Sequence, residues 1–504
     1  MPGMNADSRP ALPVSDRPYQ AIRNAPQSAR HRNEIAQRHH PGSRLSQLLP
    51  ADRDQVETVT GALSVSAKNP RPTAVSGRSV AFDDDPASAT LDAAGRIDVA
   101  WPEPPPGADP LPGQLDRWLA ARGAELVAVR RHIHAHPELS GQEFETAAMV
   151  ARELAVAGLS PRFLPKGNGV ICDIGVGDRV VALRADLDAL PLPDTKDVPY
   201  RSVIDGACHA CGHDVHTTIL LGTGLALAQL AERGELPGRV RLLFQPSEER
   251  FPSGSPEVIA AGGLKDVSSV FGLHCAPQLP TGLVGVRAGA LTAAADVVEI
   301  RVSGPGGHTA RPHMTADLVY ALSRAVVEVP SLLARRVDPR AGVSLMFGAL
   351  NAGTAANAIP IEGIAKGTVR VLSKDAWQEL PDLVPTLIRD VISGSGADVD
   401  ITYTRGVPPV INDRMATAVV AGAAAAALGS DRVVEADVSM GGEDFAFYLE
   451  QVPGAMIRLG TGIQGSVENF DIHQSRFDVD ERAIGYGIRV MVHTALAALG
   501  TVSL

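Results

Sequence analysis

Apolar positions recur with two different periods from residue 115 onward. Residues 115–134 and 146–157 carry apolar side chains at the three- and four-residue spacing that is typical of amphipathic helices. Further helical stretches, such as residues 215–231, alternate with short, β-rich and largely apolar runs, which are typical of strands. These runs cover residues 169–174, 180–184, 239–244, 268–274 and 455–459. The alternation predicts an α/β domain in which helices cover a mixed sheet.

A different order of elements fills residues 293–408. It reads strand, helix, strand, strand, helix and strand, at residues 296–303, 317–329, 344–349, 363–371, 377–393 and 398–404. This βαββαβ order is typical of a small, ferredoxin-like α+β unit with an antiparallel sheet. Because the unit interrupts the α/β pattern, we expect an inserted lid or dimerisation domain. The two parts of the larger domain would then be residues 113–292 and 409–504.

Residues 1–112 differ from the rest of the chain. They are rich in Arg, Pro, Ser, Asp and Ala, and they show little periodic apolar pattern. The segment Trp-Pro-Glu-Pro-Pro-Pro at 101–106 predicts a stiff, extended linker. We expect this region to be a disordered N-terminal extension that contributes little to catalysis.

Composition narrows the class of protein. The 504-residue chain is 45% hydrophobic and 20% charged, which is ordinary for a globular protein, and its net charge of -11 argues against a nucleic-acid partner. The apolar segment 416–428 is too short to span a membrane, and the polar N-terminus lacks the apolar core of a signal peptide. Four cysteines in so long a chain do not form a disulfide framework. We expect a cytoplasmic protein with no membrane partner.

Reactive side chains follow the predicted strands. In an α/β sheet, ligands bind outside the carboxyl ends of the strands. The side chains that occur there are Asp186, Asp188, Glu248, Glu249, His274 and His473. A lone aspartate after a strand is more often a cap or turn residue. Their accumulation at one edge of the sheet nevertheless predicts a site.

The cluster Cys-His-Ala-Cys-Gly-His-Asp at 208–214 directly precedes a predicted helix. By itself, a Cys-x-x-Cys spacing allows a redox pair or half of a structural zinc site. The neighbouring histidines and aspartate weaken the first interpretation, and the lack of a second close cysteine pair weakens the other. Cys172 and Cys275 are isolated in sequence, and we expect both in the core.

Glu248 and Glu249 are adjacent carboxylates after an apolar strand. They repel one another unless a cation compensates. On an extended backbone their side chains point to opposite sides, so one can hold a metal ion while the other faces a water molecule. As surface residues, both would simply be solvated.

A series of motifs makes residues 114–504 resemble the aminoacylase/carboxypeptidase superfamily of co-catalytic metallohydrolases, metallopeptidase family 20. The motifs are HAHPEL at 134–139, RADLDALP at 184–191, HACGHDVH at 209–216, FQPSEE at 244–249, GLH at 272–274, GHTARPH at 307–313, ANAIP at 356–360, GTVR at 367–370, MGGEDF at 440–445 and His473. Within the superfamily they are similar to the amidohydrolase branch of auxin-conjugate (IAA-amino acid) hydrolases, hippurate hydrolases and N-acetyl-diaminopimelate deacetylases. Their order across the chain makes the resemblance specific.

The resemblance implies two divalent metal ions per subunit. Their ligands would be Cys211, His213, Glu249, His274 and His473, with Cys211 bridging the ions. A thiolate suits Zn²⁺, while the nitrogen and oxygen ligands also accept Mn²⁺, Co²⁺ or Ni²⁺. Cys208 occupies a position where the family usually lacks a thiol, so we exclude it from the ligand set.

The resemblance also implies roles for residues around the metals. Glu248 would be the general base, and Asp188 would support the ligands. In the lid, His308 would reach the active site of the partner subunit in a homodimer. Asn357 and Arg370 would contact the substrate carboxylate, for which a guanidinium is suited.

The implied function is hydrolysis of N-acyl amino acids or similar amides by a metal-activated water. A dipeptidase or carboxypeptidase with the same metal machinery is the alternative, although those branches generally place an aspartate where this chain has Cys211. A non-catalytic binding protein is a third hypothesis, and the presence of all five ligands together with Glu248 argues against it. The run Arg-Phe-Pro-Ser at 250–253 departs from the glycine-rich family pattern and leaves the substrate open.

Overall fold

The computed structural model describes residues 90–91, 97–98, 110–463, 465 and 469–500. Most of the predicted N-terminal extension, 1–112, therefore lies outside the described residues. Within it, β1 (Thr90–Leu91) pairs with β2 (Ile97–Asp98), and α1 (Pro110–Ala135) already begins at Pro110.

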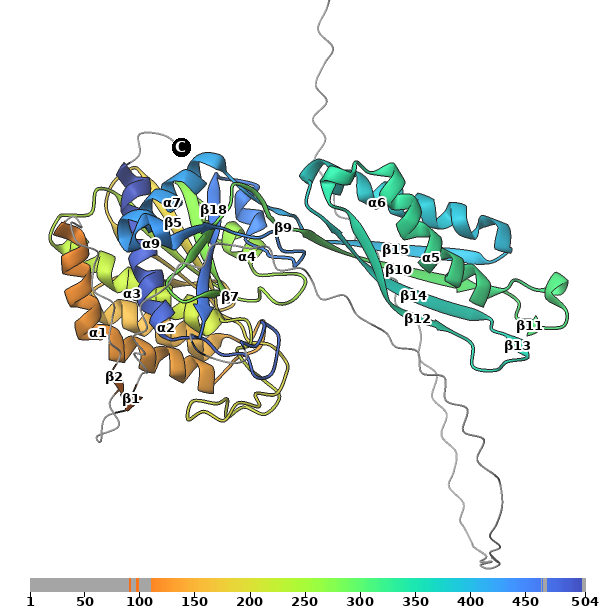
Figure 1. The fold of residues 1–504 in the computed structure, drawn as a ribbon, viewed down its shortest axis with the longest axis horizontal. Helices are drawn as coiled ribbons and strands as arrows, with labels where there is room; N and C mark the ends of the chain where they lie inside the picture. The colour runs from red at the N-terminus through yellow and green to blue at the C-terminus, as the bar shows by residue number, and fades with distance from the viewer. Residues whose placement is uncertain (1–89, 92–96, 99–109, 464, 466–468, 501–504) are drawn as a thin grey trace, which may run out of the picture. The chain divides into compact units, whose positions relative to one another are not determined.

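The larger sheet has eight strands in the order β17-β8-β18-β7-β5-β6-β4-β3 (Figure 1). The strands are β3 (Arg162–Phe163), β4 (Val170–Gly175), β5 (Val180–Asp186), β6 (Arg239–Gln245), β7 (Val267–Pro280), β8 (Val284–Val286), β17 (Val433–Glu435) and β18 (Gly454–Gly462). The central strands β6, β5, β7 and β18 are parallel to one another, whereas β4 is antiparallel to β6. All seven residues of β5 are buried, as expected for a parallel strand covered on both faces. The mixed α/β sheet predicted from the apolar runs is confirmed.

Helices cover both faces of this sheet. They are α1, α2 (Phe144–Val156), α3 (His213–Glu232), α4 (Ser255–Ala260), α7 (Arg414–Leu428), α8 (Ala446–Leu449) and α9 (Arg482–Gly500). Successive residues of β5 alternate between the two cores: Val181 and Leu183 pack with α1, α3 and α9, whereas Val180 and Ala182 pack on the side of α4 and α8. This alternation follows from the two-residue period of a strand.

One helix in the described part of the chain, α9, is long and apolar enough to cross a membrane by length and composition. However, 72% of its apolar window is buried inside the protein. It packs against α7 and α3, which is the arrangement of a core helix.

The inserted unit contains a four-stranded antiparallel sheet in the order β12-β14-β10-β15 (Figure 1). Its strands and helices are β10 (Ala294–Ser303), α5 (Leu318–Arg336), β12 (Ser344–Ala352), β14 (Glu362–Val371), α6 (Lys374–Ile392) and β15 (Asp398–Val407). Val298, Ile300 and Val302 of β10 are buried beneath the two helices, whereas the residues between them are more exposed. The βαββαβ order matches the sequence pattern.

Short elements complete the insertion and its connections. β11 (Gly307–His308) pairs with β13 (Ala358–Ile359), and neither was anticipated from the sequence. The chain enters and leaves the unit through β9 (Gly289–Thr292) and β16 (Val410–Asn412), which pair with each other. The 3-10 helices are η1 (Pro312–Met314), η2 (Pro339–Ala341), η3 (Ser393–Ser395) and η4 (Ser430–Arg432).

Candidate metal centre

A glycine in a left-handed conformation positions the first two candidate ligands. Gly212 precedes α3 with φ +87°, and a Cβ at this position would lie 2.7 Å from the thiol of Cys275. Both constraints require glycine here. The resulting tight turn brings Cys211 and His213 to the N-terminal end of α3, where both are buried.

Two further segments reach the same place through left-handed residues that are not glycine. Ser247 has φ 58°, and its N–H donates to Glu143 Oε1 at 2.7 Å, which fixes the turn after β6 that carries Glu248. His473 has φ 64°, and its N–H donates to the carbonyl of Ala210 at 2.7 Å. Such backbone conformations are uncommon and concentrate at functional sites.

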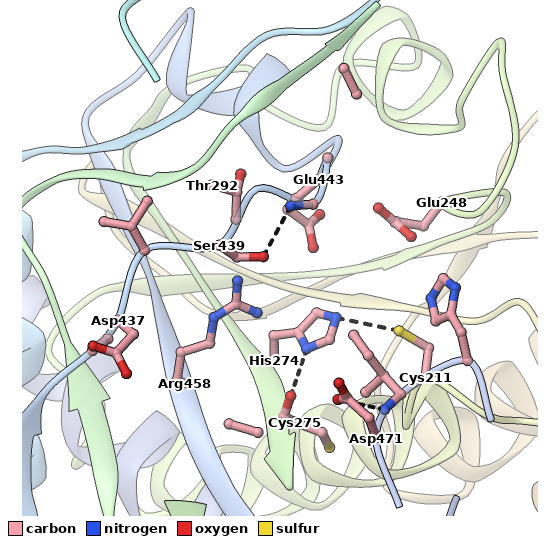
Figure 2. Close-up of a pocket in the computed structure, with 18 of the residues that line it drawn as sticks. Cys211, Glu248, His274, Cys275, Thr292, Asp437, Ser439, Glu443, Arg458 and Asp471 are labelled. Carbon is pink, nitrogen blue, oxygen red and sulfur yellow. Dashed lines mark hydrogen bonds between the residues drawn. The ribbon is translucent and has the colours of Figure 1, made fainter. Parts of the chain in front are cut away.

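The five predicted ligands meet at this position. Cys211 Sγ lies 3.5 Å from His274 Nε2, and Glu249 Oε1 lies 3.8 Å from His213 Nε2 and 3.2 Å from His473 Nε2. Donor atoms within 4.8 Å of one another form two groups that share Cys211, one with His213 and His274 and the other with Glu249 and His473. Figure 2 shows Cys211 and His274 facing one cavity. Cys211 therefore lies between two sets of donors, as a bridging ligand must.

The donor set fits divalent cations. Among the described residues, His213 Nε2 is buried without a hydrogen-bond partner, an arrangement that is costly unless something else binds it. Burial lowers the pKa of His213, but Asp186, Asp188 and Glu249 overcome this effect and raise the pKa to about 10. The cluster thus attracts positive charge. Its thiol, imidazole and carboxylate donors are those that zinc and related ions accept.

Glu248 faces the cavity next to the ligands (Figure 2). Burial, together with the carboxylates of Glu443 and Glu249, holds the pKa of Glu248 well above its usual range. A divalent ion would offset part of this repulsion. The side chain accordingly has the location and the basicity that a proton carrier needs.

Asp188 orients two of the ligands. Its Oδ1 lies 3.2 Å from His213 Nδ1, and its main-chain oxygen lies 2.9 Å from the same atom. Its Oδ2 accepts hydrogen bonds from Ser140 Oγ at 2.6 Å and from the N–H of Glu249 at 2.9 Å. A carboxylate behind a ligating histidine fixes the direction of the ring.

The structure adds a layer of residues that the sequence reasoning did not assign. The N–H of Cys275 donates to His216 Nε2 at 2.8 Å, so His216 carries its proton on Nδ1, which lies 2.7 Å from Asp186 Oδ1. Buried Arg184 reaches Asp186 at 2.6 Å and Glu443 at 3.2 Å. Apart from Cys275, these residues lie inside motifs that were already visible, at 184–191, 209–216 and 440–445. Membership of a motif was therefore the signal that could have found them.

The lid residues fall in two places. Arg370 of β14 lines the cavity together with Glu248. His308 and Asn357 are exposed and are not among the residues that line it. They lie side by side at the β11–β13 pair, where the N–H of Thr309 donates to the carbonyl of Asn357 at 3.2 Å.

Cys208 lies outside the lining of the cavity. Its thiol is buried 3.9 Å from Lys196 Nζ, and burial raises its pKa to about 12. It forms another possible donor group with His134 and Asp194, but the Lys196 ammonium lies 2.9 Å from Asp194 and already supplies positive charge there. Cys208 thus lies apart from the cavity that Cys211 lines.

The fold is a mixed-sheet domain with an inserted α+β unit. Its site combines thiol, imidazole and carboxylate donors with Glu248, a glutamate outside the predicted ligand set. Together they define the class of dinuclear metallohydrolases. Residues 182–497 match the model of Peptidase family M20/M25/M40, and the chain belongs to this family.

Three relatives illustrate the similarity. The chain is 37% identical over 380 residues to the N-acetylcysteine deacetylase of Bacillus subtilis, covering 75% of this chain and 97% of that protein. A Rhodococcus jostii protein named as a glutamate–cysteine ligase is 44% identical over 370 residues, which is 73% of this chain but only 46% of that relative's length. A solved Bacillus subtilis structure, described as a dinuclear metal binding peptidase from the M20 family, is 35% identical with a TM-score of 0.66 and covers 76% of this chain and 99% of that one.

Proposed function

We propose that this chain is a metal-dependent amidohydrolase that cleaves the amide bond of N-acyl amino acids. The observation that carries the proposal is the convergence of five donors around Cys211, four of which line one cavity of about 900 Å³ together with Glu248. A cavity of this size accommodates a small molecule. The name of the deacetylase relative supports an N-acyl substrate.

Cys211, His213, Glu249, His274 and His473 would hold two divalent ions, with Zn²⁺ or Mn²⁺ preferred and Co²⁺ or Ni²⁺ acceptable. When bound, the ions polarise the scissile carbonyl and lower the pKa of a water molecule. Two features of this chain favour such binding. The carboxylates of Glu248 and Glu249 repel each other, and the Nε2 atom of His213 is buried without a hydrogen-bond partner among the described residues.

Glu248 moves the proton. Its position in the cavity lets it take a proton from the attacking water and pass it to the leaving nitrogen. The raised pKa of Glu248, caused by burial and by neighbouring carboxylates, favours holding that proton between the two steps. Asp188 keeps His213 oriented throughout.

The lid completes the site. Arg370, which lines the cavity, would bind the carboxylate of the substrate with two parallel hydrogen bonds. Asn357 and His308 are exposed on the lid away from this cavity, so they would act in the site of a partner subunit within a homodimer. Four buried free cysteines are compatible with a reducing, cytoplasmic location.

The function is tested on purified full-length protein loaded with Zn²⁺ or Mn²⁺. N-acetyl amino acids, N-aroyl amino acids and free dipeptides would be compared by kcat/KM, with Glu248→Gln as the inactive control. We expect the N-acyl compounds to be hydrolysed faster than every dipeptide. Faster turnover of dipeptides would assign the dipeptidase or carboxypeptidase alternative instead.

The homodimer is tested by complementation. His308→Ala and Glu248→Ala are each expected to be inactive, and mixing them should restore activity in the mixed dimer. The matched control is His313→Ala, another exposed histidine of the same loop, which should need no complementation. A mixture that stays inactive although the subunits exchange would contradict catalysis across the interface.

A further inference from the structure

Arg458 is the exception in an otherwise buried strand. Every other residue of β18 is buried, and Arg458 alone is partly exposed. The strand pairs with β7 on one side and with β8 on the other, which places Arg458 level with His274 and Gly285. A charged side chain in such a strand is costly unless it meets an opposite charge.

No such charge among the described residues meets it. In the described part of the chain, Arg458 makes no hydrogen bond and no ion pair, in contrast to the fully buried Arg130 and Arg184, which are each bound to three carboxylates. Among the carboxylates, that of Glu443 has the largest electrostatic effect on Arg458. However, Glu443 contacts Arg184 at 3.2 Å. An arginine keeps its charge even when it is buried. Arg458 therefore carries a positive charge that the described residues leave unpaired.

The guanidinium of Arg458 opens into the candidate active site. Arg458 lines the same cavity as Cys211, Glu248 and His274, and Figure 2 shows its side chain extending from the strand between Ser439 and His274. A guanidinium presents a planar fork of donors that matches a carboxylate. An anion in this cavity would thus complete the interactions of Arg458.

Three arginines line the cavity, and one of them, Arg250, donates to the carbonyl of Ser140 at 3.1 Å. A substrate with one carboxylate would not use both of the remaining guanidiniums. Arg370 also lines it and, among the described residues, has no hydrogen bond or ion pair either. The two arginines come from different domains, Arg370 from β14 of the lid and Arg458 from β18 of the larger sheet. One carboxylate satisfies one fork, which leaves the other for a second acidic group.

We propose that Arg458 binds a second carboxylate of the substrate, so that the preferred substrates are N-acyl amino acids with two acidic groups. This inference rests on the proposed amidohydrolase function. The second carboxylate can belong to the amine half, as in an N-acylated acidic amino acid, or to the acyl half, as in an amide of a dicarboxylic acid.

The experiment compares substrates that differ only in this charge. N-acetylglutamate is paired with N-acetylglutamine for the amine half, and N-succinyl-leucine is paired with N-succinamyl-leucine for the acyl half. For at least one pair, we expect kcat/KM of the acid to exceed that of its amide by about 10- to 100-fold, as a charge-assisted hydrogen bond allows. The pair that shows the preference identifies the half of the substrate that Arg458 contacts.

Two variants assign the preference to this side chain. Arg458→Met should abolish the preference, mainly through KM, and leave kcat/KM of the amide substrates within about threefold, because only the charged contact is lost. Arg458→Lys should restore part of it, since the charge returns without the fork. Arg162→Met, at the far edge of the same sheet, is the control and should keep the preference.

A binding measurement separates this inference from the proposed function. Titration calorimetry of each substrate pair into the metal-loaded Glu248→Gln protein reports affinity without turnover. One outcome is that the wild-type protein hydrolyses none of the four substrates, while the acidic member of a pair binds more tightly than its neutral analogue only when Arg458 is present. In that case the proposed function is wrong and the anion site stands. If neither pair shows a preference, or if Arg458→Met weakens acid and amide equally in protein that retains its metal, the inference is overturned.

Discussion

Replacing Arg130 with methionine should destabilise the larger domain more than any exposed arginine change on the same helix. Arg130 lies in α1 with no exposed surface, and its guanidinium contacts Asp214 at 2.7 Å, Asp478 at 3.0 Å and Glu481 at 3.2 Å. Methionine fills most of the same space without the charge. Asp214, which also has no exposed surface, would then be a buried carboxylate that has lost its cationic partner and keeps only the imidazole of His134 at 2.7 Å.

The magnitude follows from which carboxylates become isolated. Asp478 and Glu481 keep 15% and 11% of their side-chain surface exposed, so water compensates part of their loss. Asp214 has no such access, and breaking a buried pair in this way costs about 3–5 kcal/mol. For a domain of roughly 270 residues, the unfolding entropy is about 0.6 kcal/mol/K, so Tm should fall by about 5–9 °C.

Calorimetry on metal-free protein at pH 7 measures this fall without a contribution from ion binding. The matched control is Arg122→Met, which makes the same change on α1 at a side chain with 43% of its surface exposed. Its ion pair with Glu125 should be worth about 0–1 kcal/mol, and its Tm should stay within about 2 °C. A Tm for Arg130→Met as high as that of Arg122→Met would refute the reasoning.

Two further measurements test whether Asp214 is the partner that matters for Arg130: the same substitution in Asp214→Asn protein, and a series of Tm values at different pH. In Asp214→Asn protein, Arg130→Met should cost less, because the isolated charge is no longer there. Burial raises the pKa of Asp214, but Arg130 and His134 overcome this and hold it well below its usual range. The pair therefore stabilises the fold above about pH 4, and this contribution is lost as the pH falls through the lowered pKa. The difference in Tm between wild type and Arg130→Met should shrink on acidification.

Three further changes test the metal centre. Gly212→Ala should lower metal content and activity, because the backbone is left-handed there and the new Cβ would lie 2.7 Å from Cys275 Sγ. The control is Gly206→Ala, where φ is similar at +73° but no atom lies within 4 Å of the new Cβ. Elemental analysis should show that this control retains its bound metal. Cys211→Ala should lose metal that Cys208→Ala retains, measured per subunit after dialysis; equal retention would contradict the assigned ligand. Glu248→Gln should keep its metal but lower kcat by about 100- to 10,000-fold, as removal of a general base does, and a smaller loss would assign the proton transfer to another group.

The sequence predicted the fold well because its signals were local. Short, largely apolar runs indicated strands of an α/β sheet, and β5 and β6 are such strands, within one or two residues of the predicted limits. The inserted α+β unit was visible from the order of its elements alone. The pair β11–β13 was not, because two-residue strands carry no periodic pattern.

The candidate ligands could be found from the sequence because they lie at strand ends and within motifs. The pairings among the supporting residues could not be found in the same way, since they join segments that are remote in the chain. Arg130 and Asp214 are separated by 84 positions, and Arg184 and Asp444 by 260. No local pattern relates such residues. Arg458 was likewise hidden, because a single arginine in an apolar strand carries no signal about the cavity that it faces.

The buried arginines explain why the site holds its shape and where it is incomplete. Arg130 fixes Asp214 at the start of α3, next to His213, and Arg184 fixes Asp186, which in turn orients His216. In both cases a buried arginine forms ion pairs with carboxylates and so fixes the helix or strand next to the candidate ligands. Arg458 has the same chemistry but no carboxylate partner in the described part of the chain, and it faces the cavity rather than the core. Because a guanidinium that is only partly exposed is costly without a counter-charge, a substrate anion can supply the partner that the described residues do not.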